Sequence, residues 1–246
     1  AMTLQTLRAL RAEKSARLEA GTARQISEFL VALFQVADPS EAKGSYVTAR
    51  EILDKGSHNI RTELKDQPLI QARLMDTIGN VYVSLGLFKR AEALLEKALQ
   101  TRESRLPSGH PDVATALNSL ALLYKNQGRY AAAEPLYKRA LAIREKAFGR
   151  EHADVAELLN NLAALYQLQG RYALAEPLYV RALEIRENVL GPDHKDVATS
   201  LNNLAWLYYA QGFYVRVEPL FRRALGIFEK ALGPDHPDLA IALNNL

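Results

Sequence analysis

The chain has 246 residues, of which 48% are hydrophobic and 24% charged, a composition typical of a folded globular protein and too apolar for a disordered one. It contains no cysteine, which excludes disulfide bonds and thiolate metal sites. The formal charge of +3 is too small an excess to predict nucleic-acid binding, which usually needs a concentrated basic face.

The N-terminal part of the chain carries the weakest pattern. Residues 1–25 predict an amphipathic helical extension, and residues 26–67 predict a degenerate first helical repeat. The first helix of that repeat is expected to be displaced to residues 25–36, because Ala37-Asp38-Pro39-Ser40 breaks the helical pattern.

A strict repeat follows from residue 68. Histidine recurs every 42 residues, each time with an aspartate two positions later, at His110, His152, His194 and His236. Each period holds two apolar runs at helical spacing, separated by a glycine. Each period therefore predicts two antiparallel helices that bury their apolar faces by stacking on neighbouring pairs. The expected repeats are 68–109, 110–151, 152–193 and 194–235, with the truncated start of a fifth at 236–246, as in a fragment of a longer chain.

The residues within each period resemble the tetratricopeptide repeat. Leu117-x2-Leu120-Ala121-x2-Tyr124 is followed by Ala133-x3-Tyr137-x2-Ala140, which matches that repeat's order of small and bulky positions. The 42-residue period, with Leu-Asn-Asn-Leu-Ala and Ala-Glu-Pro-Leu-Tyr, is similar to the kinesin-light-chain type that many bacterial proteins carry. The resemblance covers residues 68–246 and implies an all-α fold, a right-handed superhelical solenoid of antiparallel helix pairs.

A second resemblance concerns residues 36–54. Val36-Ala37-Asp38-Pro39-Ser40, with Thr48-Ala49-Arg50-Glu51, is similar to a segment that precedes the repeats in bacterial transmembrane Ser/Thr kinases. The chain has no glycine-rich loop, His-Arg-Asp or Asp-Phe-Gly motif, so it would be the non-catalytic tail of such a kinase. That architecture implies an extracytoplasmic location; otherwise we expect a cytoplasmic one.

The periodic His-x-Asp pairs raise the question of a metal site, because both residue types ligate zinc. The aspartates fall in the first turn of the first helix of each pair, where a carboxylate meets free N–H groups and the positive end of the helix. We therefore interpret the aspartates as residues that stabilise the start of the helix, and we expect the histidines to pack or cap there too. The sequence shows no convergent set of titratable groups for acid–base catalysis, and we predict no metal, cofactor or catalytic residue.

Asparagine recurs at one position of the repeat, one residue past a core leucine. Residues four and seven positions further on share its helix face. In tetratricopeptide arrays this face lines the concave groove, and resemblance to kinesin light chains implies that the asparagines hold a ligand's backbone. Alternatively, they bond to neighbouring helices and stiffen the stack. The candidate peptide-binding residues are Asp76, Asn80, Asn118, Leu122, Lys125, Asn160, Gln167, Asn202, Trp206 and Tyr209.

Two further features bear on this groove. Trp206, the only tryptophan, lies out of phase with the core residues; with Tyr209 it forms either an aromatic platform or a contact partly buried under the next repeat. Three arginines recur in the second helix of the pairs, at Arg102, Arg144 and Arg186. They either line the rim of the groove and favour an acidic ligand, or pair with the glutamate that follows each of them or with the helix end.

These features favour an interaction module that binds a protein or peptide segment in the concave groove. Two other hypotheses stay open: a regulatory or sensory tail of a larger bacterial signalling protein such as a Ser/Thr kinase, and a scaffold whose repeats associate end to end. We expect no enzyme activity, no nucleic-acid partner and no membrane contact by these residues.

Overall fold

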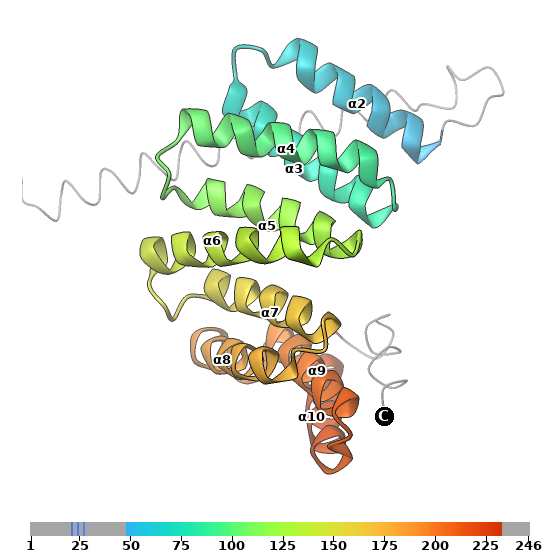
Figure 1. Ribbon diagram of the computed structural model, residues 1–246, viewed down its shortest axis with the longest axis vertical. Helices are drawn as coiled ribbons and strands as arrows, with labels where there is room; N and C mark the ends of the chain where they lie inside the picture. Colours follow the sequence, from blue (N-terminus) through green and yellow to red (C-terminus); the bar gives the residue numbers. More distant parts are fainter. Residues whose placement is uncertain (1–20, 22–23, 25–26, 28–47, 233–246) are drawn as a thin grey trace, which may run out of the picture. The chain divides into compact units, whose positions relative to one another are not determined.

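The computed structural model describes residues 21, 24, 27 and 48–232, and all regular structure within 48–232 is α-helical. The chain divides into two compact units, residues 1–105 and 106–246, which carry helices α2–α4 and α5–α10 (Figure 1). The predicted extension at 1–25, the displaced helix at 25–36 and the start of a fifth repeat at 236–246 lie outside the described residues, apart from three isolated positions.

Unit 1 contains α2 (Ala49–Glu63), α3 (Pro68–Ser84) and α4 (Phe88–Arg105). Helix α2 begins with a capping box, in which the Thr48 hydroxyl accepts from the Glu51 N–H and the Glu51 carboxylate accepts from the Thr48 N–H. Helices α3 and α4 form a hairpin across a short turn at Gly86, whose φ of 71° favours glycine. These two helices are packed so closely that a Cβ on Gly79 would lie 2.6 Å from Leu95 Cδ2.

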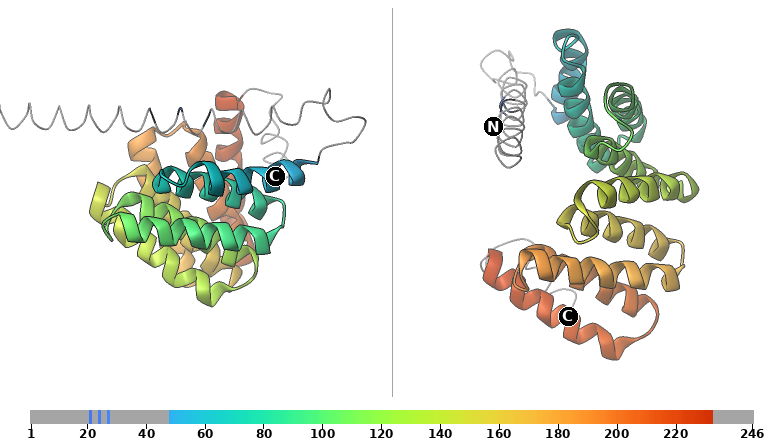
Figure 2. Two further views of the ribbon diagram at one scale, coloured as in Figure 1. Left: turned by 90° about the horizontal axis from the view of Figure 1, so that it is seen from above. Right: turned by 90° about the vertical axis from the view of Figure 1, so that its left-hand side faces the viewer.

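The described part of unit 2 is a series of three helical hairpins. They are formed by α5 (Pro111–Asn126) with α6 (Tyr130–Phe148), α7 (Ala153–Leu168) with α8 (Tyr172–Leu190), and α9 (Lys195–Ala210) with α10 (Tyr214–Leu232). Helix α6 also packs on α7, and α8 on α9, so each hairpin stacks on the next (Figures 1 and 2). The predicted all-α fold of antiparallel helix pairs is confirmed.

The repeated histidines begin these hairpins. His110, His152 and His194 are the N-cap residues of α5, α7 and α9, and each Nδ1 accepts the N–H of the aspartate two positions on, at 3.1–3.2 Å. One of the N–H groups left without a helical partner at the start of each helix is thereby satisfied. The prediction of a capping role is confirmed for these three pairs; His236 lies outside the described residues.

The core of unit 2 follows the predicted small and bulky positions. Ala163, on α7, and Ala182, on α8, are fully buried. Around Ala182, the side chains of Val155, Leu159 and Ile185 form one continuous apolar cluster. Protein interiors are close-packed, so the small methyl side chain of each alanine allows the facing helix to approach closely.

Polar contacts tie each hairpin of unit 2 to the next. The Glu134 carboxylate of α6 accepts from Tyr166 Oη at 3.0 Å, from Arg171 Nη1 at 2.8 Å and from Lys138 Nζ at 2.7 Å. The hydrogen bond from Lys138, with those from Arg171 and Tyr166, lowers the pKa of Glu134 to about 2. One repeat later, Tyr208 Oη donates to Glu176 at 2.9 Å in the same arrangement.

Candidate functional site

The equivalent helices α5, α7 and α9 lie side by side in unit 2, with α5 contacting α7 and α7 contacting α9. Each presents a stripe of partly exposed side chains, because residues spaced by three or four share one helix face. We call this surface the ladder face. It consists of Asn118, Leu122 and Lys125 on α5, Asn161, Ala164 and Gln167 on α7, and Asn202, Asn203, Trp206 and Tyr209 on α9.

A ladder of asparagine side chains joins these three helices. Asn161 Nδ2 on α7 donates to Asn118 Oδ1 on α5 at 3.0 Å, and Asn203 Nδ2 on α9 donates to Asn160 Oδ1 on α7 at 3.2 Å. Asn160 is only 5% exposed, and its amide also donates to Ala156 O at 3.1 Å. Asn118 and Asn160 therefore bond to neighbouring helices, as in the alternative that the repeated asparagines stiffen the stack.

Asn202 ends the described part of the ladder. Its side chain is half-buried, and its Oδ1 is buried with no hydrogen-bond partner among the described residues. The role of these asparagines toward a ligand's backbone stays a prediction.

Trp206 and Tyr209 form an exposed aromatic pair on α9. They are 44% and 50% exposed, and their rings meet edge to face at 5.5 Å between centroids. The other edge-to-face partner of Trp206 is Phe221 of α10, which is buried, at 5.7 Å. The indole therefore contacts the core at one side and is exposed at the other; its role as an aromatic platform stays a prediction, because the next repeat lies outside the described residues.

The same positions in the other hairpins are not aromatic. Leu122 and Lys125 hold them on α5, both half-buried, and burial lowers the pKa of Lys125. On α7 they are Ala164 and Gln167, and the Gln167 Oε1 accepts from Tyr179 Oη at 3.0 Å. The ladder face thus changes from aliphatic and cationic on α5 to aromatic on α9.

In unit 1, the equivalent of the first asparagine is a buried ion pair. Asp76 and Arg102 are 4% and 3% exposed, and Arg102 Nη1 lies 2.7 Å from Asp76 Oδ2. Asn80, one turn further along α3, is half-buried. The Arg102 guanidinium of the same hairpin pairs with Oδ2 of Asp76, while Oδ1 is buried without a hydrogen-bond partner among the described residues. An entirely unpaired carboxylate at this depth would be costly.

The rim position, one of the two alternatives for the repeated arginines, does not hold where the side chain is buried. Arg102 pairs with Asp76, and Arg186, which is 8% exposed, donates to Ser200 Oγ at 2.8 Å and to the Asp196 carbonyl at 3.0 Å. Arg144 is half-buried and bonds to Asp154 and Thr115. Burying a guanidinium is costly unless it is paired, and each of these three arginines is paired within the helix stack.

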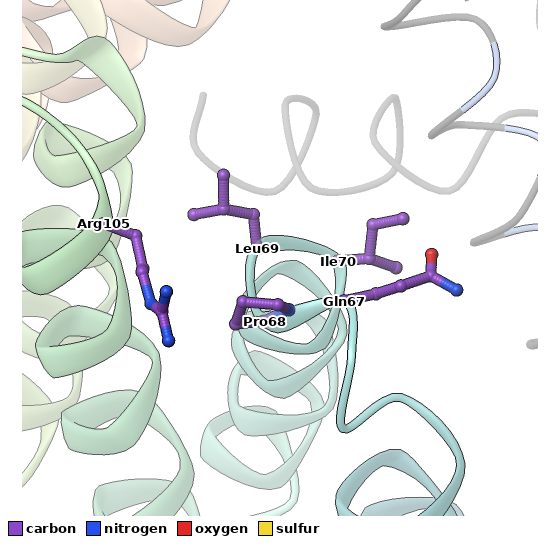
Figure 3. Close-up of a pocket in the computed structure, with 5 residues that line it drawn as sticks. All are labelled: Gln67, Pro68, Leu69, Ile70 and Arg105. Atoms are coloured by element: carbon purple, nitrogen blue, oxygen red, sulfur yellow. The ribbon is translucent and has the colours of Figure 1, made fainter.

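A hollow of about 380 Å³ lies where α3 begins and α4 ends (Figure 3). Gln67, Pro68, Leu69 and Ile70 come from the start of α3, and Arg105 comes from the end of α4. Among the described residues that line this hollow, Arg105 is the only titratable one. No cluster of three or more metal-ligating side chains occurs among the described residues, and no helix there is long and apolar enough to cross a membrane.

Sequence reasoning missed the second asparagine of each Leu-Asn-Asn-Leu run and the glutamate contacts between hairpins. Asn161 and Asn203 are the donors that complete the ladder, and Glu134 and Glu176 receive the tyrosines of the next hairpin. The signal was present, because asparagine, glutamate and tyrosine all recur at the repeat period.

Comparison with known families identifies the repeat. Residues 70–146, 112–186 and 154–216 match a tetratricopeptide repeat family, and residues 197–238 match a second tetratricopeptide repeat description. The chain belongs to the tetratricopeptide repeat family. No curated protein matches the chain. The resemblance of residues 36–54 to a kinase segment stays a prediction.

Solved structures show the same fold. BtubC (BKLC) from P. vanneervenii is 25% identical with a TM-score of 0.65, and the match covers 92% of this chain and 89% of that one. A putative kinesin light chain with nearly identical TPR-like repeats from Podosopora anserina is 26% identical with a TM-score of 0.62, over 73% of this chain and 85% of that one. The apo form of RapI shares the fold at 16% identity and a TM-score of 0.65, over 83% of this chain and 71% of that one.

The kinesin-light-chain-like character of the tetratricopeptide repeats is confirmed by these neighbours. The family is typically non-catalytic, and its fold supports a protein–protein interaction module with protein partners.

Proposed function

We propose that the ladder face of unit 2 binds an extended peptide segment of a partner protein, with an apolar or aromatic side chain of that segment seated on Trp206 and Tyr209. The observation that carries this proposal is the exposure of these two rings, 44% and 50%, on a helix whose other bulky apolar side chains are buried. Exposed aromatic rings in contact with each other are enriched at binding sites, because they offer much apolar area at little entropic cost.

The charge of the ladder face favours a segment with few charges. Lys125 is the only cation among the residues that define it, and all the other side chains are asparagine, glutamine, alanine, leucine or aromatic. The asparagine ladder holds α5, α7 and α9 in register, so the side chains around it are placed before a ligand arrives. Preorganisation of this kind reduces the entropy lost on binding.

The contacts also change the roles that the asparagines would have. Asn160 is buried and bonded within the stack, so its contribution to binding would be indirect. The half-buried Asn118 and Asn202 and the partly exposed Gln167 would offer the polar contacts to a ligand's backbone, beside Leu122 and Lys125. In unit 1, Asp76 is buried in an ion pair, which leaves Asn80 as the candidate contact there.

Selection from a displayed library of random peptides on the immobilised chain tests the proposal. The selected peptide should bind Trp206→Ala at least tenfold more weakly, as expected when a central aromatic contact of about 1.4 kcal/mol or more is removed. The control is Phe148→Ala, which removes another exposed ring, 42% exposed, at the end of α6 and away from the ladder face. Equal affinity for the wild type and Trp206→Ala would refute the assignment of the site. The kinase-tail and end-to-end scaffold hypotheses stay predictions.

A further inference from the structure

A second pocket lies within unit 1, and we propose that it binds a small aliphatic carboxylate. The pocket measures about 380 Å³, within the usual range for small-molecule sites. Helix α2 supplies Asp54, Ser57, His58 and Arg61; Tyr82 comes from the end of α3, and Arg90, Ala93 and Leu94 come from α4.

The one carboxylate in the pocket is already satisfied. Asp54 accepts a hydrogen bond from Tyr82 Oη at 2.6 Å and is paired with the Arg90 guanidinium. Burial alone would raise the pKa of Asp54, but the hydrogen bonds from Tyr82 and Arg90 outweigh it and lower that pKa. Asp54 and Arg90 therefore neutralise each other, and the charge that remains on the lining belongs to Arg61, beside His58.

Comparison with unit 2 shows what this pocket lacks. There, a glutamate near the end of the second helix of one hairpin pairs with an arginine on the second helix of the next hairpin, 36 residues later. Glu145 pairs with Arg181 at 2.8 Å, and Glu187 pairs with Arg223 at 2.6 Å. The repeat register puts Arg61 of α2 at the glutamate position and Lys97 of α4 at the arginine position. Two cations thus replace an ion pair, and the missing group is a carboxylate.

The remaining walls fit the rest of such a ligand. Ala93 and Leu94 line the pocket on α4, and Lys97 lies on the same face of that helix, three residues beyond Leu94. Within the described residues, Arg61 makes no ion pair, so its planar guanidinium is available to a carboxylate in the bidentate geometry that arginine favours. A ligand carboxylate would take the place of the absent glutamate, with its carbon chain against Ala93 and Leu94.

The test is an NMR titration of the full 246-residue chain with glutarate, and with glutaramide as its uncharged counterpart, at constant ionic strength. We expect saturable shifts confined to the residues that line the pocket with glutarate and none with glutaramide. Arg61→Gln should weaken binding about tenfold or more, as for loss of a hydrogen bond to a charged group. Lys89→Gln, which removes an exposed cation of α4 outside the pocket, should leave the affinity unchanged.

Arg61→Glu distinguishes a specific carboxylate site from nonspecific binding of anions to an excess of positive charge. It restores the ion pair seen in unit 2, so it should abolish glutarate binding and raise the melting temperature. The proposal is overturned if glutarate causes no saturable shift, if glutaramide or inorganic phosphate shifts the same resonances equally, or if Arg61→Gln binds as the wild type does. An unchanged or lower melting temperature for Arg61→Glu would equally overturn the missing-carboxylate argument. None of these results depends on whether the ladder face binds a peptide.

Discussion

Asn160→Ala should destabilise the protein, because the structure places this side chain at the middle of the asparagine ladder. Its amide donates to Ala156 O at 3.1 Å and to Ser200 Oγ at 3.3 Å, and its Oδ1 accepts from Asn203 Nδ2 at 3.2 Å. At 5% exposure, water does not replace these partners freely.

The expected loss of unfolding free energy depends on which groups Asn160→Ala leaves without hydrogen-bond partners. Ser200 Oγ keeps its hydrogen bond from Arg186 at 2.8 Å, so the main loss falls on the amide of Asn203, which is half-buried and partly rehydrated. Leaving a buried donor unsatisfied costs about 1–3 kcal/mol, and about 2 kcal/mol is reasonable here. In a chain of this size that loss lowers the melting temperature by about 4–8 °C.

Thermal unfolding followed by circular dichroism measures this shift. Asn126→Ala is the matched control, since it truncates an exposed asparagine at the end of α5 and should change stability by less than about 0.5 kcal/mol. The double variant Asn160→Ala/Asn203→Ala should cost less than the sum of the two single variants, because they share one hydrogen bond. If Asn160→Ala melts with the wild type, the ladder does not stabilise the stack and our reading of these contacts is wrong.

Three further substitutions test other contacts by the same unfolding assay. Ala163→Leu should overpack the interface at a fully buried alanine and cost about 1–3 kcal/mol; unchanged melting would contradict the helix phase. Arg102→Met should cost about 3–5 kcal/mol at neutral pH, because it leaves the Asp76 carboxylate buried and unpaired; a neutral effect would contradict the ion pair. The pKa of Glu134, lowered to about 2, means that its stabilisation is present above about pH 4.5 and lost as the pH falls toward 2. Glu134→Gln should reduce the loss of unfolding free energy at acid pH by on the order of 1 kcal/mol, a value that allows for solvent around Lys138. The same dependence of stability on acid pH in the variant and the wild type would contradict this.

The helices could be predicted from the sequence because local signals mark both their ends. His110 and the glycine at 128 bracket α5, and the 42-residue period carries the same marks to α7 and α9. The exposure of Trp206 also follows from the helix phase, since Trp206 lies beside the buried positions rather than among them. Such inferences depend only on the rotation of about 100° per residue along a helix.

The partners of the polar side chains could not be predicted in this way. Which of two adjacent asparagines faces the preceding helix depends on how neighbouring helices are rotated against each other, as Asn160 and Asn161 show. The reach of Arg102 to Asp76, 26 residues earlier, depends on the packing of α3 against α4. At the repeat position of Asn118 the first full repeat has Asp76, whose side chain forms a buried ion pair within its own hairpin.

The fluorescence of Trp206 provides the most direct test of peptide binding on the ladder face. It is the only tryptophan in the chain and is 44% exposed, so its emission reports on this one place. When a tryptophan-free peptide obtained by selection is added, we predict a saturable shift of the emission to shorter wavelength and protection from acrylamide quenching, because the bound side chain removes water from the indole. A peptide that binds by calorimetry while the emission and the quenching of Trp206 stay unchanged would contradict the account.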